Sequence, residues 1–171
     1  MKIVLNDANI LIDLFHLELV EAFFSLQNLE LKTTDFVYEE LHEDQKIVIN
    51  QFVQNQSLSL IESSEDDLFN IYQIHSTTNG LSIEDCSVLH HAKKSIGILL
   101  TGDGKLRKQS LADGVEVRGI LYVFDQLLFA ELISFELAIE KLNQLYLLNG
   151  RLPIAAKNQR LDYWSRSEHV V

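Results

Sequence analysis

Short apolar segments alternate with longer amphipathic segments along this chain, and this alternation limits its possible folds more than any other feature. Five segments have the apolar composition of buried strands: residues 3–6, 29–33, 58–62, 98–101 and 115–118. Strands that alternate with helices pair in parallel through right-handed crossovers. We therefore expect an α/β fold of three layers, α/β/α, with a central parallel sheet.

Helical spacing of apolar residues predicts the connections between the strands. The predicted helices cover residues 10–26, 36–42, 45–55, 65–75, 82–94, 105–112, 121–132 and 135–147. The helix over 82–94 has the clearest start, because Ser82 can cap it and Asp85 occupies the capping-box position. Pro153 can begin a last helix. We expect one domain over residues 1–150 and a helical tail over 151–171 that packs on it or on a partner.

Composition excludes several classes of protein. The chain has 171 residues and a single cysteine, so it suits one domain and cannot form an internal disulfide. No apolar run approaches the length of a membrane span, and the apolar run at the N-terminus is too short for a signal peptide. We expect a soluble cytoplasmic protein that does not interact with a membrane.

Charge is distributed unevenly along the chain. The net charge is −11, which argues against a general nucleic-acid coat. Residues 1–92 hold sixteen acids and three bases, whereas residues 93–118 hold six bases and three acids. The basic segment can be a pair of solvated helix faces or a patch that contacts phosphate, and the sequence leaves both interpretations open.

Acidic residues lie at the predicted carboxyl edge of the sheet, where open α/β sheets bind ligands. Asp7 follows the first strand and Asp103 the fourth, while Glu40 and Asp85 lie on helices that adjoin this edge. Clustered carboxylates repel one another unless a cation lies between them, and Mg²⁺ prefers oxygen ligands. Each acid also has a structural interpretation, as a helix cap for the three aspartates and as a solvated helix face for Glu40 and its neighbour Glu39.

With these segments identified, the chain resembles the PIN-domain nucleases, which include the VapC-type toxins of toxin–antitoxin pairs. The resemblance rests on four stretches in order, Leu5-Asn-Asp-Ala-Asn-Ile-Leu-Ile-Asp13, Val37-Tyr-Glu-Glu-Leu41, Leu81-Ser-Ile-Glu-Asp-Cys-Ser-Val-Leu89 and Leu99-Leu-Thr-Gly-Asp-Gly-Lys-Leu106. It extends to about residue 130, and the segment 149–153 resembles a longer PIN-like subgroup.

The resemblance implies a metal-dependent endoribonuclease that uses Mg²⁺ or Mn²⁺. Asp7, Glu40, Asp85 and Asp103 match the family's catalytic and metal-binding acids, and Asn9 and Thr101 match its supporting polar positions. Glu40 is preferred to Glu39 because it directly precedes Leu41, as in the family's Glu-Leu pair. The implied partners are an RNA substrate, an antitoxin protein and a second copy of the chain.

Two features of the segment after Asp103 affect this interpretation. Lys105, Arg107 and Lys108 lie within five residues of Asp103, so we expect them to contact the RNA backbone. Many family members carry a further acid two or three residues after this aspartate, where this chain has Lys105 and Leu106. A PIN-fold protein that serves interaction or RNA binding, with weak or lost catalysis, is therefore the alternative function. A receiver-like or phosphatase domain fits less well, because Asp7-Ala8-Asn9 lacks its Asp-x-Asp pattern.

Three other features are interpreted as structural. Cys86 is expected on the buried face of its helix, as a small apolar residue. His90 and His91 are not expected to share a ligand, since adjacent helical residues diverge by about 100°, and no zinc-type spacing of Cys and His occurs. Trp164 and its neighbour Tyr163 are expected to pack the tail on the domain.

Overall fold

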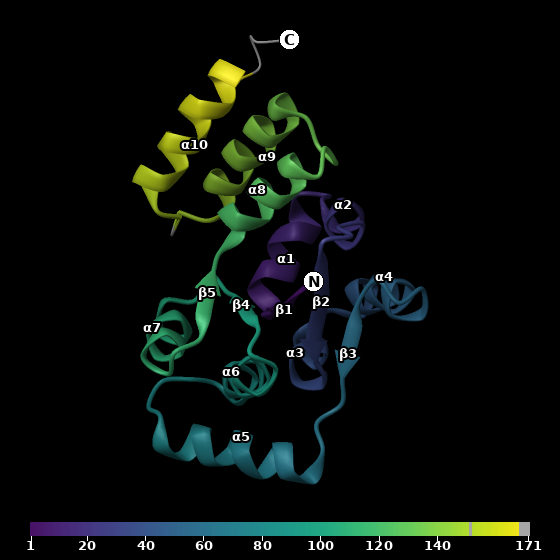
Figure 1. Ribbon diagram of the computed structural model, residues 1–171, viewed down its shortest axis with the longest axis vertical. Coiled ribbons are helices and arrows are strands. Elements are labelled where there is room, and N and C mark those ends of the chain that lie inside the picture. The colour runs from purple at the N-terminus through teal and green to yellow at the C-terminus, as the bar shows by residue number, and fades with distance from the viewer. Residues whose placement is uncertain (151, 168–171) are drawn as a thin grey trace. The chain divides into compact units, whose positions relative to one another are not determined.

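The central feature of the fold is an all-parallel sheet of five strands (Figure 1). The computed structural model describes residues 1–150 and 152–167. The strand order is β3-β2-β1-β4-β5, and the strands are β1 (Lys2–Asn6), β2 (Leu29–Thr34), β3 (Ser59–Ile61), β4 (Ile98–Leu100) and β5 (Glu116–Arg118). Helices flank this sheet. The predicted α/β fold with a central parallel sheet is confirmed, and each predicted strand is present within two residues of its predicted ends.

The helices largely occupy the predicted positions. They are α1 (Ala8–His16), α2 (Val20–Phe24), α3 (Asp35–Glu40), α4 (Glu43–Gln54), α5 (Glu65–Thr77), α6 (Ile83–Ser95), α7 (Gly104–Ala112), α8 (Ile120–Phe129), α9 (Phe135–Leu148) and α10 (Ile154–Ser167). The single helix predicted over 10–26 is wrong, because α1 and α2 divide it. Glu18 has φ 57° between them, in the left-handed region, which turns the backbone. Leu17 and Leu19 are buried on both sides of this turn, so the apolar pattern continues through it.

The described chain forms two compact units. The first comprises Met1–Ile12 and Gln27–Ile120 and contains the sheet; the second comprises Asp13–Leu26 and the described residues from Leu121 onward. The domain boundary expected at residue 150 stays a prediction, and Arg151 and residues 168–171 of the expected tail lie outside the described residues. None of the described helices combines the length and the apolar character needed to cross a membrane.

Helix α6 packs against the central strands β1, β2 and β4. Its apolar face is fully buried, and Cys86 lies in it with 0% exposure, as predicted. The predicted capping box of Ser82 and Asp85 is present at its first turn. At its other end, a Cβ on Gly97 would lie 3.0 Å from a Leu5 methyl carbon, so glycine permits the close approach of this helix end to β1.

The second unit holds the predicted last helix, α10. Trp164 is 2% exposed, and its ring centroid lies 5.9 Å from that of Phe124 on α8. Arg160 adds a two-nitrogen contact with the Asp125 carboxylate, at 2.6 Å for its shortest bond. The packing role predicted for Trp164 is confirmed, whereas Tyr163 is exposed.

Candidate active site

The strand order reverses between β1 and β4, and the candidate site begins where these two strands end. Asn6 pairs with Leu100 in the parallel register, and the Asp7 amide donates to the Leu100 carbonyl at 3.1 Å. Asp7 and Thr101 therefore leave the sheet side by side. Reversal points of this kind form the ligand crevice of open α/β sheets.

Asp7 is buried, and its carboxylate accepts hydrogen bonds from three neighbouring groups. It is 3% exposed, and its carboxylate accepts hydrogen bonds from the Thr101 hydroxyl at 2.7 Å and the Ala8 amide at 2.8 Å. The Asn9 side-chain amide donates to the same carboxylate, while Asn9 Oδ1 accepts from the Gly102 amide at 2.8 Å. The two predicted supporting residues, Asn9 and Thr101, thus both contact Asp7 and connect it to the loop after β4.

Asp103 and Asp85 both cap helices and both face the region of Asp7. Asp103 Oδ1 accepts from the amides of Lys105 and Leu106 at 2.9 and 2.8 Å, which begins α7. Asp85 Oδ2 accepts from the Ser82 amide at 2.9 Å in the capping box. The structural interpretations of these two acids are confirmed.

Glu39 and Glu40, at the end of α3, have different neighbours. Glu39 bonds the Lys46 ammonium at 2.8 Å. Glu40 instead interacts electrostatically with Asp7, Asp85 and Glu84. The structure therefore brings Glu40, and not Glu39, together with the other acids.

The electrostatics of these carboxylates are those of an uncompensated cluster. Burial raises the pKa of Asp7 to about 6; the Thr101 hydrogen bond opposes this, and the charges of Asp85 and Asp103 add to it. Partial desolvation, followed by the charges of Glu84, Asp7 and Asp85, raises the pKa of Glu40 to about 7. Glu40 is an exposed residue, so solvent screens these charges more than it does at the buried Asp7. Burial and neighbouring acids also raise the pKa of Asp85. A cation between these groups would favour their ionised forms.

The donor set fits a hard, hydrated cation. Every donor is a carboxylate, hydroxyl or amide oxygen, as Mg²⁺ and Mn²⁺ prefer. In the part of the chain that the structure describes, no three of these acids bring oxygens within 4.8 Å of one another. An ion at this site would therefore contact some of these acids through water, and Mg²⁺ keeps several of its waters in proteins.

Glu84 is an acid of this region that the sequence interpretation missed. It lies in the first turn of α6, beside Asp85, and its charge is the strongest electrostatic influence on the pKa of Glu40. The available signal was its position next to Asp85 in a helix that begins at the site. Helical geometry alone did not indicate that α3 would bring Glu40 to the same place.

The three basic residues predicted to contact the RNA backbone, Lys105, Arg107 and Lys108, have different environments. The Arg107 guanidinium donates to the Thr101 carbonyl at 3.1 Å, so it supports the loop that carries Asp103. The Lys105 side chain lies over Gly80, with its ammonium 3.5 Å from the position of a Cβ there. Lys108 is exposed on α7.

Outside this site, the expectation that His90 and His91 cannot share a ligand is wrong. Ring nitrogens of both lie within 4.8 Å of each other and of an Asp67 carboxylate oxygen. The reason is tertiary: α5 packs on α6 and brings Asp67 to both imidazoles, whose long side chains overcome the angle between their Cα atoms.

Comparisons with known proteins agree with this fold. A family model described as a PIN domain matches residues 3–165. No curated protein matches the chain significantly. The solved structure of PAE2754 from Pyrobaculum aerophilum has 18% identity and a TM-score of 0.50, over 72% of this chain and 95% of its own.

Two further solved structures are similar at the same level. VapBC-1 from nontypeable Haemophilus influenzae has 16% identity and a TM-score of 0.50, over 70% of this chain and 98% of its own. VapBC2 from Rickettsia felis, bound to a DNA fragment from its promoter, has 13% identity and a TM-score of 0.50, over 68% and 98%. At these identities the similarity establishes a shared fold.

Proposed function

The chain belongs to the PIN-domain family, a family of nucleases, and on that premise we propose that it is a metal-dependent endoribonuclease hydrolysing RNA phosphodiester bonds. The observation that carries this proposal is the electrostatic coupling of Asp7, Glu40 and Asp85 where the strand order reverses. Desolvation raises the pKa of all three carboxyls and their mutual charges add to it, which is the environment expected of a site that binds a cation or a proton.

Asp7, Asp85 and Asp103 would hold Mg²⁺ or Mn²⁺, with Glu40 binding directly or through water. When bound, the ion supplies an activated water for in-line attack and neutralises charge on the leaving oxygen. Asp7 is fixed by Thr101 and Asn9, so its carboxylate needs little reorganisation to act as a ligand. Asp85 and Asp103, which cap the helices beside it, would supply the remaining carboxylate ligands.

Leu106 and Lys105 explain why a second strongly held ion is not part of this proposal. Leu106 is 0% exposed, so core packing occupies one position where many relatives carry the further acid. Lys105 places an ammonium, not a carboxylate, at the other. We propose instead that Glu84 supplies negative charge that the missing acid would otherwise provide, because its carboxylate acts electrostatically on Glu40 and Asp85.

Lys105 and Lys108 would guide the phosphate backbone toward this negative site. Both are exposed on the first turns of α7, the helix that Asp103 caps. A basic helix surface beside an acidic metal site allows an anionic substrate to approach carboxylates that would otherwise repel it. Arg107 donates to the Thr101 carbonyl and would stabilise the loop between β4 and α7, which carries Asp103.

The test is Mn²⁺-dependent cleavage of a structured RNA by the Asp103→Asn variant. Asparagine preserves an N-cap oxygen, so α7 is expected to remain folded while cleavage is lost. The exposed Asp44 in the first turn of α4 provides the matched control, and Asp44→Asn should cleave as the unaltered protein does. Undiminished cleavage by Asp103→Asn contradicts the site. Mn²⁺-dependent thermal stabilisation without cleavage of any RNA favours the interaction or RNA-binding role instead.

We further propose that the protein is the toxin of a toxin–antitoxin pair, since two structures that share its fold carry VapBC names. Induced expression in a bacterial host should then arrest growth, and co-expression of a small protein encoded beside it should restore growth and co-purify with it. Arrest must require Asp103, because growth inhibition by Asp103→Asn would reflect something other than nuclease activity.

A further inference from the structure

A second cluster of metal-binding residue types lies between α5 and α6, on residues different from those of the acidic site. Asp67 is in the first turn of α5, and His90 and His91 are adjacent in the middle of α6. One ligand atom from each residue lies within 4.8 Å of the other two. Asp67 and His91 are 5% and 4% exposed, and His90 is partly buried.

The two imidazoles approach each other edge to face. Their ring centroids are 4.9 Å apart with an angle of 69° between the planes, and His90 Nε2 lies 2.7 Å from Asp67 Oδ1. A tetrahedral ion about 2.1 Å from each ligand needs ligand atoms about 3.4 Å apart. His90 Nε2 and Asp67 Oδ1 are closer than that value, and all three ligand atoms lie within 4.8 Å of one another, so side-chain rotation must separate the close pair to admit an ion.

Hydrogen bonds already orient the carboxylate and the buried imidazole. Asp67 Oδ2 accepts from the Ser64 amide at 3.1 Å and the Ser64 hydroxyl at 2.7 Å, which leaves Oδ1 directed toward His90. The Ser63 hydroxyl lies 3.3 Å from His91 Nε2 and donates to Asp35 at 2.9 Å. Partners of this kind fix the orientation of ligands in metal sites.

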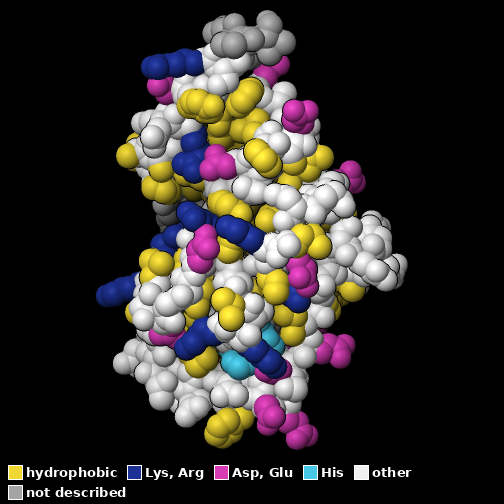
Figure 2. All heavy atoms as spheres, in the orientation of Figure 1, with side chains coloured by type: hydrophobic (Ala, Val, Ile, Leu, Met, Phe, Trp, Pro, Cys, Tyr) yellow, Lys and Arg dark blue, Asp and Glu magenta, His cyan; other side chains and the backbone are white. Residues whose placement is uncertain are grey.

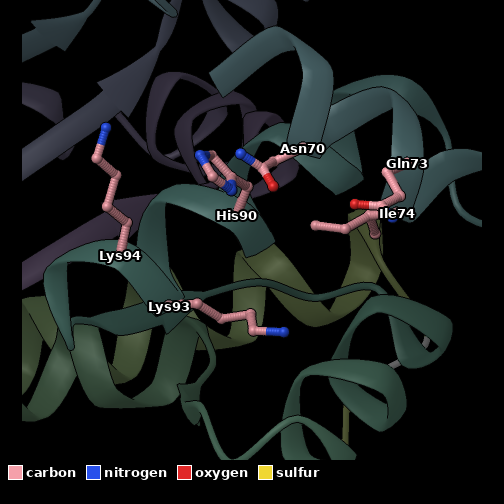
Figure 3. A pocket seen from close by; sticks show the side chains of 6 residues that line it. All are labelled: Asn70, Gln73, Ile74, His90, Lys93 and Lys94. Atoms are coloured by element: carbon pink, nitrogen blue, oxygen red, sulfur yellow. The ribbon is translucent and has the colours of Figure 1, made fainter. Parts of the chain in front are cut away.

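A hollow of about 430 Å³ gives solvent access to one side of the cluster. Three residues of α5 and three of α6 line it, namely Asn70, Gln73, Ile74, His90, Lys93 and Lys94 (Figure 3). Histidine and lysine side chains are visible together over α6 in the space-filling view (Figure 2). An ion can therefore reach His90 from solvent without the core opening.

We propose that Asp67, His90 and His91 form a binding site for a zinc-class divalent ion that joins α5 to α6. Two imidazoles and one carboxylate are a donor set of three-ligand zinc sites, in which a water completes the coordination. This set contains nitrogen, unlike the all-oxygen site at Asp7, so it selects a softer ion than Mg²⁺.

Lys94 places a positive charge where the ion would lie. Its ammonium lies 2.7 Å from the same Asp67 Oδ1, and its side chain is 59% exposed. Metal binding therefore requires Lys94 to turn toward solvent, which its exposure permits. Lys94 therefore competes with the ion for Asp67. Removing Lys94 should strengthen metal binding, whereas removing a ligand should weaken it.

The experiment titrates metal-free, full-length protein with ZnCl₂ by calorimetry and repeats the titration with Co²⁺, whose visible absorption reports nitrogen ligands. With excess Mg²⁺ present to fill the acidic site, one zinc ion per chain is expected, with a melting temperature raised by about 5–10 °C at a hundredfold excess over Kd. His90→Gln should weaken zinc binding by more than about 100-fold. Lys94→Met should tighten it about two- to fivefold, because a competing ion pair is removed.

His75→Gln is the matched control, since His75 is an exposed histidine of α5 outside the cluster. It should leave zinc binding unchanged. The titration is also made in Asp103→Asn, where zinc binding must persist if the acidic site is separate; retained zinc binding there together with lost RNA cleavage distinguishes the two sites. Zinc binding that is insensitive to His90→Gln, or weakened by Lys94→Met, would overturn the proposal.

Discussion

The Thr101 hydroxyl donates to the Asp7 carboxylate at 2.7 Å, joining residues that are 94 positions apart in the sequence. The same hydroxyl accepts from the Asp103 amide at 3.0 Å. One buried side chain thus connects the acid after β1 to the acid after β4. The geometry of the candidate site depends on this connection.

Replacement of Thr101 by valine tests that connection. Valine keeps the shape but removes the hydroxyl, so the Asp7 carboxylate loses a donor and the Asp103 amide loses an acceptor. We expect the free energy of unfolding in denaturant to fall by about 1–3 kcal/mol and Mn²⁺-dependent cleavage to decrease. Thr101→Ser retains the hydroxyl and should behave nearly as the unaltered protein; equal losses in both variants would refute a role for the hydrogen bond.

Stability of the metal-free protein should depend on pH through Asp7 and Glu40. Both have folded-state pKa values above the ordinary ones of 3.8 and 4.5, at about 6 and about 7, so the folded state binds these protons more tightly than the unfolded state. These groups therefore stabilise the fold most below about pH 4, and that stabilisation is lost as pH rises to about 7.

Denaturant unfolding with a chelator at intervals between pH 4 and 8 measures this effect. Asp7→Asn should make the dependence shallower, because the substituted amide does not titrate. Added Mn²⁺ should stabilise the protein more at pH 8 than at pH 5, since ions bind the ionised carboxylates. A stability that increases from pH 5 to 8 in the chelated protein would contradict the raised pKa values.

Glu84 is expected to strengthen metal binding through charge. Glu84→Gln removes one of the charges that acts on Glu40 and Asp85, so the pKa of Glu40 should fall and the affinity for Mn²⁺ should decrease about two- to fivefold. Calorimetric titration with Mn²⁺ measures this. Glu65→Gln, at an exposed first-turn position of α5, is the control. Identical Mn²⁺ affinities for the two variants would exclude Glu84 from the site.

Lys105 and Lys108 are expected to contact RNA phosphates. In an Asp103→Asn background that prevents cleavage, Lys105→Gln and Lys108→Gln should each weaken binding of a single-stranded RNA. Each should also reduce the slope of log affinity against log salt by about 0.7. Lys2→Gln removes an exposed lysine at the opposite, amino end of the sheet and should leave the slope unchanged. A slope that neither α7 variant changes would show that this basic segment is a solvated helix face that does not contact RNA.

Trp164 should contribute most of the energy that packs α10 in the second unit. Trp164→Ala removes a nearly buried ring beside Phe124 and is expected to lower the free energy of unfolding by about 3–5 kcal/mol. The neighbouring Tyr163 is exposed, so Tyr163→Ala should change the free energy of unfolding by less than about 0.5 kcal/mol. Chemical denaturation of both variants provides the comparison, and similar losses would show that Trp164 is not the anchor.

Local patterns were sufficient for much of the fold. The strand ends, the capping box at Ser82 and the burial of Cys86 all follow from apolar periodicity and capping preferences, which involve residues close in sequence. The break between α1 and α2 was missed for the same reason, because apolar residues continue through the turn at Glu18.

By itself the sequence determined the parallel α/β sheet and the presence of Asp7 and Asp103 at its carboxyl edge, because strand alternation leaves few topologies and places those positions together. Only the tertiary structure decided which side chains meet across elements. It separated Glu40 from Glu39, added Glu84 and brought Asp67 to both histidines. Those contacts depend on how helices pack against one another. Helix packing is determined by side-chain contacts between residues far apart in the chain, which local sequence patterns do not reveal.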